Sequence, residues 1–219
     1  MSVMDIFDGL NDAQKAAVAY TDGPLLVLAG AGSGKTKTLT HRIAYLLTYE
    51  RVWPNEILAV TFTNKAAREM RERLSALISQ PNTRQFMPWM GTFHGICVRI
   101  LRRDGPAIGV PSNFIIYDEA DRQGLIKQAM KQLSIAPDKL KPRSVSAVIS
   151  NAKNDLLTPD DYAAAAQYPN QQHIAKIYDR YEQLRSEAGA LDFDDLLIET
   201  VRLLRDASEI RQKYRQYFK

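Results

Sequence analysis

A glycine-rich loop at residues 29–36 constrains the fold of this chain more than any other segment. It reads AGAGSGKT, follows the apolar run 25–28, and precedes a helix-like segment at 38–47. A strand, a glycine-rich loop and a helix in that order form a phosphate-binding loop, in which backbone N–H groups and the helix N-terminus converge on an anion. The segment therefore predicts a site for a nucleoside triphosphate.

Two side chains in this loop carry most of the expected chemistry. We expect Lys35 to reach the β- and γ-phosphates of ATP and the Thr36 hydroxyl to bind Mg²⁺. The remaining phosphate-binding backbone is predicted to come from Ala29, Gly30, Ala31, Gly32, Ser33 and Gly34. The strict pattern opens with glycine, whereas this chain has Ala29. An ordinary Gly/Ser loop is the alternative, and the flanking segments disfavour it.

Composition excludes several other classes of protein. The 219 residues contain one cysteine and three histidines, which give no zinc-site spacing. Cys97 lies in an apolar stretch, so a buried structural thiol is favoured over a nucleophile. No apolar run is long enough to cross a membrane, and the N-terminus has no signal-peptide pattern. We therefore expect a cytoplasmic protein whose one metal is nucleotide-bound Mg²⁺.

Positive charge is concentrated in one third of the chain. The whole chain carries a net charge of +4, but residues 37–103 hold eleven Lys/Arg and four Asp/Glu, a net +7. A basic surface on a nucleotide-binding domain indicates a phosphate backbone as partner. A solvated basic face with no partner is the alternative on charge alone.

The order of predicted elements indicates an α/β fold with a parallel sheet. A short helix is expected within residues 1–20, and strands are expected at 25–28, 57–62 and 89–93. A helix follows the loop to about residue 49, and another covers 66–74. After residue 111 the pattern becomes polar and helical, with candidate helices at 121–133, 144–153, 159–166 and 173–188. We interpret this part as a mostly α-helical insertion.

An acidic segment follows the apolar patch 114–117 and reads Asp-Glu-Ala-Asp. Asp118 and Glu119 have the sequence of a Walker B strand end, which would make the chain a self-contained small NTPase or kinase. Asp118, Glu119 and Asp121 are equally good capping and first-turn residues for the following helix. The residues alone leave both interpretations open.

Several segments together resemble the UvrD/Rep/PcrA group of superfamily 1 DNA helicases. The segment at 10–14 resembles the adenine-reading Q motif, and AGAGSGKT is similar to motif I, including its opening alanine. The stretch at 59–67 resembles motif Ia, the stretch at 91–95 resembles motif Ib, and LDFDDLL at 191–197 resembles the segment that re-enters the first ATPase domain. The resemblance runs over the whole chain in order and spacing.

The resemblance assigns roles around the nucleotide and along the DNA. Gln14 would hydrogen-bond adenine, and Lys37 stands where the family often has arginine, which keeps the charge but loses planar stacking. Single-stranded DNA would contact Phe62, Thr63, Asn64, Lys65, Thr92, Phe93 and His94. Phe62 is expected to stack on a base. The pattern alone favours a buried strand residue at Phe62 and a core histidine at His94.

The resemblance also implies a division into domains. Residues 1–110 would be the first part of a RecA-like ATPase domain, 111–190 the helical insertion, and 191–219 the return into the first domain. The Mg²⁺-binding Asp, the water-activating Glu and the second motor domain would lie beyond residue 219, so this chain alone is expected to be inactive.

The parent would then be an ATP-dependent helicase that moves 3′ to 5′ on single-stranded DNA and unwinds duplex. The segment at 118–121 then belongs to the insertion. Asp192, Asp194 and Asp195 form a possible metal cluster, although a structural role at a helix start is favoured.

Overall fold

The computed structural model describes residues 5–80 and 82–219, so residues 1–4 and Pro81 of the predicted first domain lie outside the described part. The chain forms two compact units. The first comprises Met1–Ile96 and Gln212–Lys219, and the second comprises Cys97–Arg211. These divisions fall within helices, whereas the sequence places the domain boundaries near residues 110 and 190.

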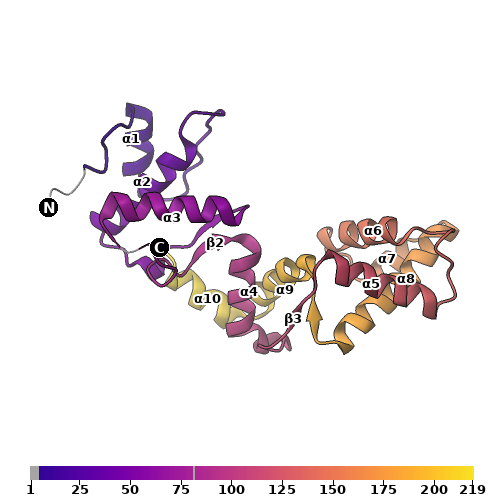
Figure 1. Cartoon of the computed structure of the whole chain (residues 1–219). Helices are drawn as coiled ribbons and strands as arrows, with labels where there is room; N and C mark the ends of the chain where they lie inside the picture. The colour runs from indigo at the N-terminus through magenta and orange to yellow at the C-terminus, as the bar shows by residue number, and fades with distance from the viewer. Residues whose placement is uncertain (1–4, 81) are drawn as a thin grey trace. The chain divides into compact units, whose positions relative to one another are not determined.

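The first unit is built from helices around a two-stranded sheet (Figure 1). Its elements are α1 (Asp12–Ala19), α2 (Lys35–Thr48), the 3-10 turn η1 (Pro54–Glu56), β1 (Ala59–Thr61), α3 (Asn64–Ile78), β2 (Met90–Thr92), the start of α4 (Phe93–Asp104) and the end of α10 (Ser208–Tyr217). Their apolar faces share one core, which includes Val18, Ile43, Met70, Leu74 and Met90. The predicted helices are therefore present, and α2 begins directly at the glycine-rich loop.

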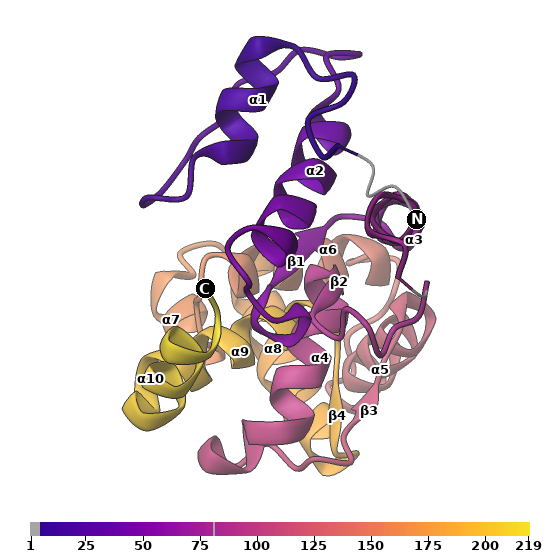
Figure 2. The ribbon, with the colours of Figure 1, turned by 90° about the vertical axis from the view of Figure 1, so that its left-hand side faces the viewer.

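Strands β1 and β2 run parallel and lie side by side (Figure 2). Their register pairs Ala59 with Met90 and Thr61 with Thr92. The predicted strands at 57–62 and 89–93 are thus confirmed in shortened form. Because the strands are parallel, the residues that follow them emerge at one edge of the sheet, where the carboxyl ends meet.

The prediction of a strand at 25–28 is wrong. This segment has no regular secondary structure, and Leu26 and Leu28 are 82% and 87% exposed. A continuous apolar run is typical of a central parallel strand that is covered on both faces and paired on both edges. Neither described strand of this unit pairs with 25–28, since β1 and β2 form a sheet of two strands. Without a partner, its backbone N–H and C=O groups favour water over a strand.

The end of the chain packs against the first unit through aromatic rings. Trp89 is buried and makes edge-on contacts with Tyr214, Tyr217 and Phe218. The Lys219 backbone N–H donates to the Glu56 carbonyl oxygen at 3.1 Å, just before β1. The last residues are therefore held beside the start of β1.

The second unit is mainly helical. It contains the rest of α4, η2 (Gly105–Ile108), β3 (Ile115–Ile116), α5 (Glu119–Gln132), α6 (Pro142–Asn154), α7 (Pro159–Ala165), α8 (Pro169–Glu187), β4 (Ala190–Leu191), α9 (Phe193–Asp206) and the start of α10 (Ser208–Tyr217). Figure 1 shows α5 to α8 gathered together. Ile126, Val145, Ile149, Ile177 and Tyr181 fill the core between them.

The four helices predicted between residues 121 and 188 are confirmed, with ends that differ by a few residues. The largest difference is at the start of α8, which begins at Pro169 and not at residue 173. Proline is favoured in the first turn of a helix, so it can mark this start. Short parallel strands β3 and β4 pair Ile115 with Ala190 at the base of this helical group. Among the described residues, no helix is long and apolar enough to span a membrane.

Candidate nucleotide and nucleic-acid site

The glycine-rich loop turns directly into α2. Gly32 and Gly34 adopt left-handed conformations with φ of 76° and 82°, which favour glycine, and Gly34 is the N-cap of α2. The Lys35 Nζ donates to the carbonyl oxygens of Ala29 at 3.0 Å and Gly30 at 2.8 Å. The lysine ammonium is therefore curled back over the loop, at the positive end of the helix dipole.

Two further predicted residues contact this loop from its rim. The Gln14 amide donates to the Ser33 carbonyl oxygen at 2.9 Å, while its oxygen accepts the Asn11 N–H at 3.0 Å in the capping box of α1. The Lys37 Nζ donates to the Gly9 carbonyl oxygen at 2.6 Å. A Cβ added to Gly34 would lie 2.9 Å from the Gln14 amide nitrogen, so a larger residue at position 34 would displace the Gln14 side chain from its bond to the loop.

A pocket of about 310 Å³ opens beside the loop. Its lining comprises Ala17, Leu25, Val27, Lys35, Thr38, Leu39 and Arg42. Arg42 donates to the carbonyl oxygens of Ala17 and Tyr20, which ties α2 to the end of α1. Thr36, in the first turn of α2, is exposed. The pocket therefore brings two cations and an apolar wall next to the helix N-terminus.

The carboxyl edge of the sheet presents two aromatic rings. Phe62 follows β1, Phe93 follows β2, and their ring centroids are 5.6 Å apart. Phe62 is 89% exposed, so the buried-strand interpretation of this residue is wrong. Pairing of Thr61 with Thr92 places the two phenylalanines at equivalent positions of neighbouring strands. An exposed aromatic pair of this kind offers faces for stacking.

The other predicted DNA contacts surround the aromatic pair. Thr63 is the N-cap of α3, and its hydroxyl accepts the Ala66 N–H. Asn64 and Lys65 form the exposed first turn of that helix. The Thr92 hydroxyl accepts the Gly95 N–H at 3.1 Å at the start of α4. His94 is exposed, so the core-histidine interpretation is wrong.

The acidic segment after β3 is a helix cap. The Asp118 carboxylate accepts the N–H groups of Ala120 and Asp121, and Asp121 accepts the Asp118 N–H in return. These bonds lower the pKa of Asp118, with the Asp121 N–H as the largest cause. Glu119 accepts from Gln123 and Ser146. The geometry thus accounts for the Asp-Glu-Ala-Asp sequence through the start of α5.

The aspartates of the LDFDDLL segment have basic partners. Asp192 and Asp195 contact Lys153 at 2.9 and 2.6 Å, and Asp194 contacts Arg122 at 2.9 Å. No group of His, Cys, Asp and Glu suited to a metal ion occurs among the described residues. Each of the three aspartates is therefore paired with a basic side chain at the start of α9.

Cys97 is half-buried in the second unit. Burial raises the pKa of its thiol, opposed by a hydrogen bond with Thr200. The neutral thiol is the stable form at neutral pH, as expected for a structural cysteine.

A second basic surface, not predicted from the sequence, lies in the second unit. Lys127, Lys131, Lys139, Lys141 and Arg143 are all exposed on α5, the α5–α6 connection and the first turn of α6. Asp138 is the one acidic residue between positions 127 and 143. The local excess of basic residues was a usable signal, but residues 111–190 as a whole hold ten Lys/Arg and ten Asp/Glu, so their net charge hides it.

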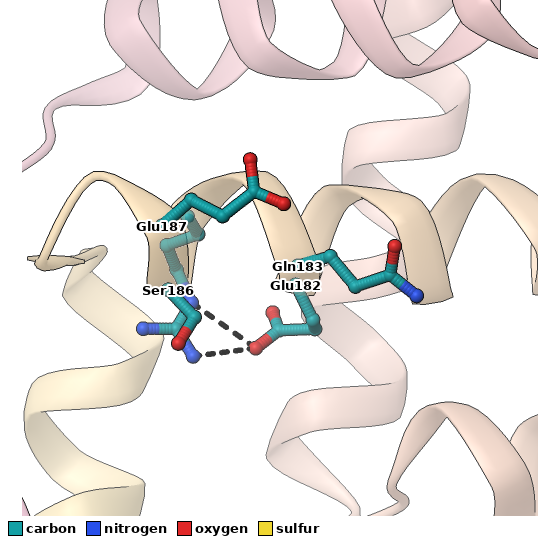
Figure 3. Close-up of a pocket in the computed structure, with 5 residues that line it drawn as sticks. Glu182, Gln183, Ser186 and Glu187 are labelled. Carbon is teal, nitrogen blue, oxygen red and sulfur yellow. Dashed lines mark hydrogen bonds and ion pairs between the residues drawn. The ribbon is translucent and has the colours of Figure 1, made fainter.

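A shallow hollow beside the end of α8 holds none of the predicted site residues. Its volume is about 540 Å³, and it is lined by Glu182, Gln183, Arg185, Ser186 and Glu187. Figure 3 shows the Glu182 carboxylate held by two interactions. These are the hydrogen bonds from the Arg185 guanidinium at 3.1 and 2.6 Å. All five residues come from one stretch of a single helix, α8.

Comparison with known proteins agrees with this geometry. The family model described as the UvrD/REP helicase N-terminal domain matches residues 10–219. A protein of Leuconostoc citreum named ATP-dependent DNA helicase PcrA is 47% identical over 100% of this chain. Proteins of the same name from Staphylococcus aureus (strain Mu50 / ATCC 700699) and Bacillus subtilis (strain 168) are 46% and 45% identical over 97% of it.

The match covers only part of each relative. This chain spans 29% of the Leuconostoc citreum and Staphylococcus aureus proteins and 28% of the Bacillus subtilis protein. The family model nevertheless covers nearly the whole chain, including the glycine-rich loop and both aromatic residues at the sheet edge. The chain therefore belongs to the UvrD/REP helicase N-terminal domain family.

Proposed function

We propose that this chain is the N-terminal nucleotide- and DNA-binding part of an ATP-dependent DNA helicase. One observation carries the proposal: a phosphate-binding loop and an exposed aromatic pair occur in the same compact unit. The first feature suits ATP, and the second suits the bases of a single strand. The parent protein would use ATP hydrolysis to move 3′ to 5′ on single-stranded DNA and unwind duplex.

The nucleotide side of the proposal rests on the loop and the start of α2. Lys35 would exchange its bonds to the Ala29 and Gly30 carbonyl oxygens for bonds to phosphate oxygens. Thr36 would bind nucleotide-associated Mg²⁺ through its hydroxyl, and the left-handed glycines suit a loop whose N–H groups face an anion. Mg²⁺ would supply charge neutralisation between the phosphates. Gln14 would give up its bond to Ser33 to read adenine.

The DNA side rests on the carboxyl edge of the sheet. Bases would stack on Phe62 and Phe93, and the helix N-termini at Asn64 and His94 would face phosphate groups. Lys65 would add a charge-assisted contact, while Thr63 and Thr92 would shape the edge through their capping bonds. Stacking does not depend on base identity, which suits a motor that moves along any sequence.

The basic surface at α5 and α6 extends this proposal to a second contact with nucleic acid. Between positions 127 and 143, five exposed cations accompany one acidic residue. A surface with this excess of positive charge is complementary to a phosphate backbone. Duplex DNA would release counterions on binding there, so its affinity should fall with added salt.

We also propose the domain division that the resemblance implies. Residues 1–110 and 191–219 would belong to one RecA-like domain, and 111–190 would be its helical insertion. The strand that pairs with 25–28, the Walker B acids and the second motor domain would come from the part of the relatives that this chain does not match. Cytoplasmic localisation follows from a DNA substrate. Asp118 is engaged in a helix cap, which argues against a self-contained NTPase that uses it.

The proposal is tested by DNA binding and ATP turnover of residues 1–219 beside the full-length parent. A fluorescent single-stranded oligothymidine should bind this chain, and Phe62→Ala should weaken binding by about 1–3 kcal/mol, or about 5- to 150-fold. Trp53→Ala is the matched control, because Trp53 is 70% exposed in the same unit but lies away from the sheet edge, between α2 and η1.

Two results would overturn the proposal. The first is equal DNA affinity for wild type and Phe62→Ala. The second is vigorous ATP turnover by this chain alone. Turnover should be negligible without the Walker B acids and the second motor domain, because phosphoryl transfer needs the full set of catalytic charges. Strong DNA-stimulated turnover by the parent and none by this chain is the expected outcome.

A further inference from the structure

A buried ionic cluster joins the helical group to the start of α9. Its centre is Lys153 of α6, which is 3% exposed and lies 2.6 Å from Asp195, 2.7 Å from Glu182 and 2.9 Å from Asp192. Arg185 of α8 contacts Glu182 at 2.6 Å and Asp195 at 3.1 Å. Three elements, α6, α8 and α9, therefore meet at one set of charges.

The charges of this cluster do not balance. Two cations, Lys153 and Arg185, face three carboxylates, Asp192, Asp195 and Glu182. The neighbouring pair of Arg122 from α5 with Asp194 is neutral and leaves the excess unchanged. Fully ionised, the cluster would hold one uncompensated negative charge in a buried site, which is costly.

Hydrogen bonds distribute this excess unevenly. Asp192 accepts from the Tyr181 hydroxyl at 2.6 Å, from Lys153 at 2.9 Å and from the Asp195 N–H at 2.9 Å. Asp195 accepts the Asp192 N–H at the start of α9 and one bond from Lys153. Glu182 Oε1 lies at ion-pair distance from Lys153 but has no aligned hydrogen bond. Among the described residues, the hydroxyls of Tyr178 and Ser150 also face the cluster.

We propose that this cluster binds one proton and acts as a proton-linked latch between the helical group and α9. With the proton bound, the buried charges balance and α6 and α8 are held on α9. Loss of the proton leaves an excess carboxylate, which favours opening of the junction to water.

The pKa values support the direction of this linkage. Burial, opposed by Lys153 and Arg185, raises the pKa of Asp195 to about 7. A group whose pKa is raised on folding stabilises the closed state below its unfolded pKa and loses that effect as pH rises through the folded pKa. The pKa values of Asp192 and Glu182 are lowered, chiefly by Lys153 against the opposing effect of burial, so these groups titrate on the acid side of this window.

Hydrogen exchange of residues 1–219, corrected for the intrinsic effect of pH, tests the latch. Amides of α6 and the first turns of α9 should open about 30-fold more readily at pH 8 than at pH 5.5. Asp195→Asn and Glu182→Gln each remove the excess charge, so either variant should reduce this ratio to about twofold or less. Asp179→Asn, an exposed change on the same helix, should keep the wild-type ratio.

The wild-type profile alone can overturn the proposal. Equal protection of α6 and α9 at the two pH values would exclude a proton-linked latch. A ratio that persists in both neutralising variants would assign the pH dependence to other groups. A variant that fails to fold is recognised by circular dichroism, and the wild-type profile and the second variant then decide.

Discussion

Replacement of Lys153 by methionine tests how much of the helical unit depends on one buried charge. Methionine keeps an unbranched side chain of similar length but removes the cation that lies 2.6 to 2.9 Å from three carboxylates. Among the described residues, Arg185 would then be the one cation left at ion-pair distance from Glu182 and Asp195. Removing one partner of a buried ion pair costs about 3–5 kcal/mol, because the other charge stays buried. We expect this loss in the free energy of unfolding of the second unit at pH 8.

The loss should shrink as the pH falls. Without Lys153, a second carboxylate of the cluster should have a folded pKa above its unfolded value. Such a group contributes stability at low pH and loses it as pH rises through the folded pKa. Each additional proton taken up recovers at most about 1.4 kcal/mol per pH unit. The difference between Lys153→Met and wild type should therefore be smaller at pH 5.5 than at pH 8.

Two spectroscopic signals separate the units in this experiment. Both tryptophans, Trp53 and Trp89, belong to the first unit, so their emission follows that unit during urea unfolding. Far-UV circular dichroism follows both units. Lys153→Met should shift the dichroism transition and leave the tryptophan transition in place. Lys176→Met, at an exposed position of α8, is the matched control. A shift below about 1 kcal/mol, or an equal shift in the control, would refute the reasoning.

Three further changes test other parts of the structure. Trp89→Ala should destabilise the first unit by about 3–5 kcal/mol, because its buried ring packs on Tyr214, Tyr217 and Phe218; thermal unfolding followed by Trp53 emission measures this. Gly34→Ala should strain the start of α2 by about 1–2 kcal/mol and weaken binding of a fluorescent ATP analogue, since φ is +82° there. Asp118→Asn should leave ATP turnover of the full-length parent unchanged, because asparagine caps a helix as well as aspartate; loss of turnover would make Asp118 catalytic.

Local signals in the sequence predicted most of the helices and both main strands. Helix starts are marked by capping residues whose partners lie within three positions, such as Asn11 with Gln14 and Thr63 with Ala66. The same locality explains why the Asp-Glu-Ala-Asp segment was ambiguous. Asp118 follows an apolar patch and precedes a helix. The same local sequence is therefore expected for a helix N-cap and for a Walker B acid at the end of a strand. The bonds to Ala120 and Asp121 decide in favour of the cap.

Features that depend on distant partners were not predictable in this way. The run 25–28 has the composition of a central strand, but a strand also needs neighbours, and β1 and β2 pair with each other. Phe62 is a second case in which local sequence does not predict burial. A buried residue was the favoured interpretation from the pattern, whereas its place beyond the end of β1 exposes the ring beside Phe93. In both cases the sheet, rather than the local sequence, decides burial.

The ionic cluster could have been predicted in part, because the sequence places a lysine on the buried face of α6. Val145, Ile149 and Lys153 recur at intervals of four, so Lys153 continues the buried stripe of α6. A lysine at the end of an apolar stripe needs acidic partners. Two of these partners come from the aspartate-rich start of α9, where Asp192 lies 39 residues from Lys153 in the sequence. The resemblance marked the LDFDDLL segment as a re-entry point of the chain. In the structure its aspartates contact Lys153 of α6 and Arg185 of α8, so these two helices are held at the start of α9. Under the proposed proton linkage, the excess carboxylate would weaken this junction as the pH rises.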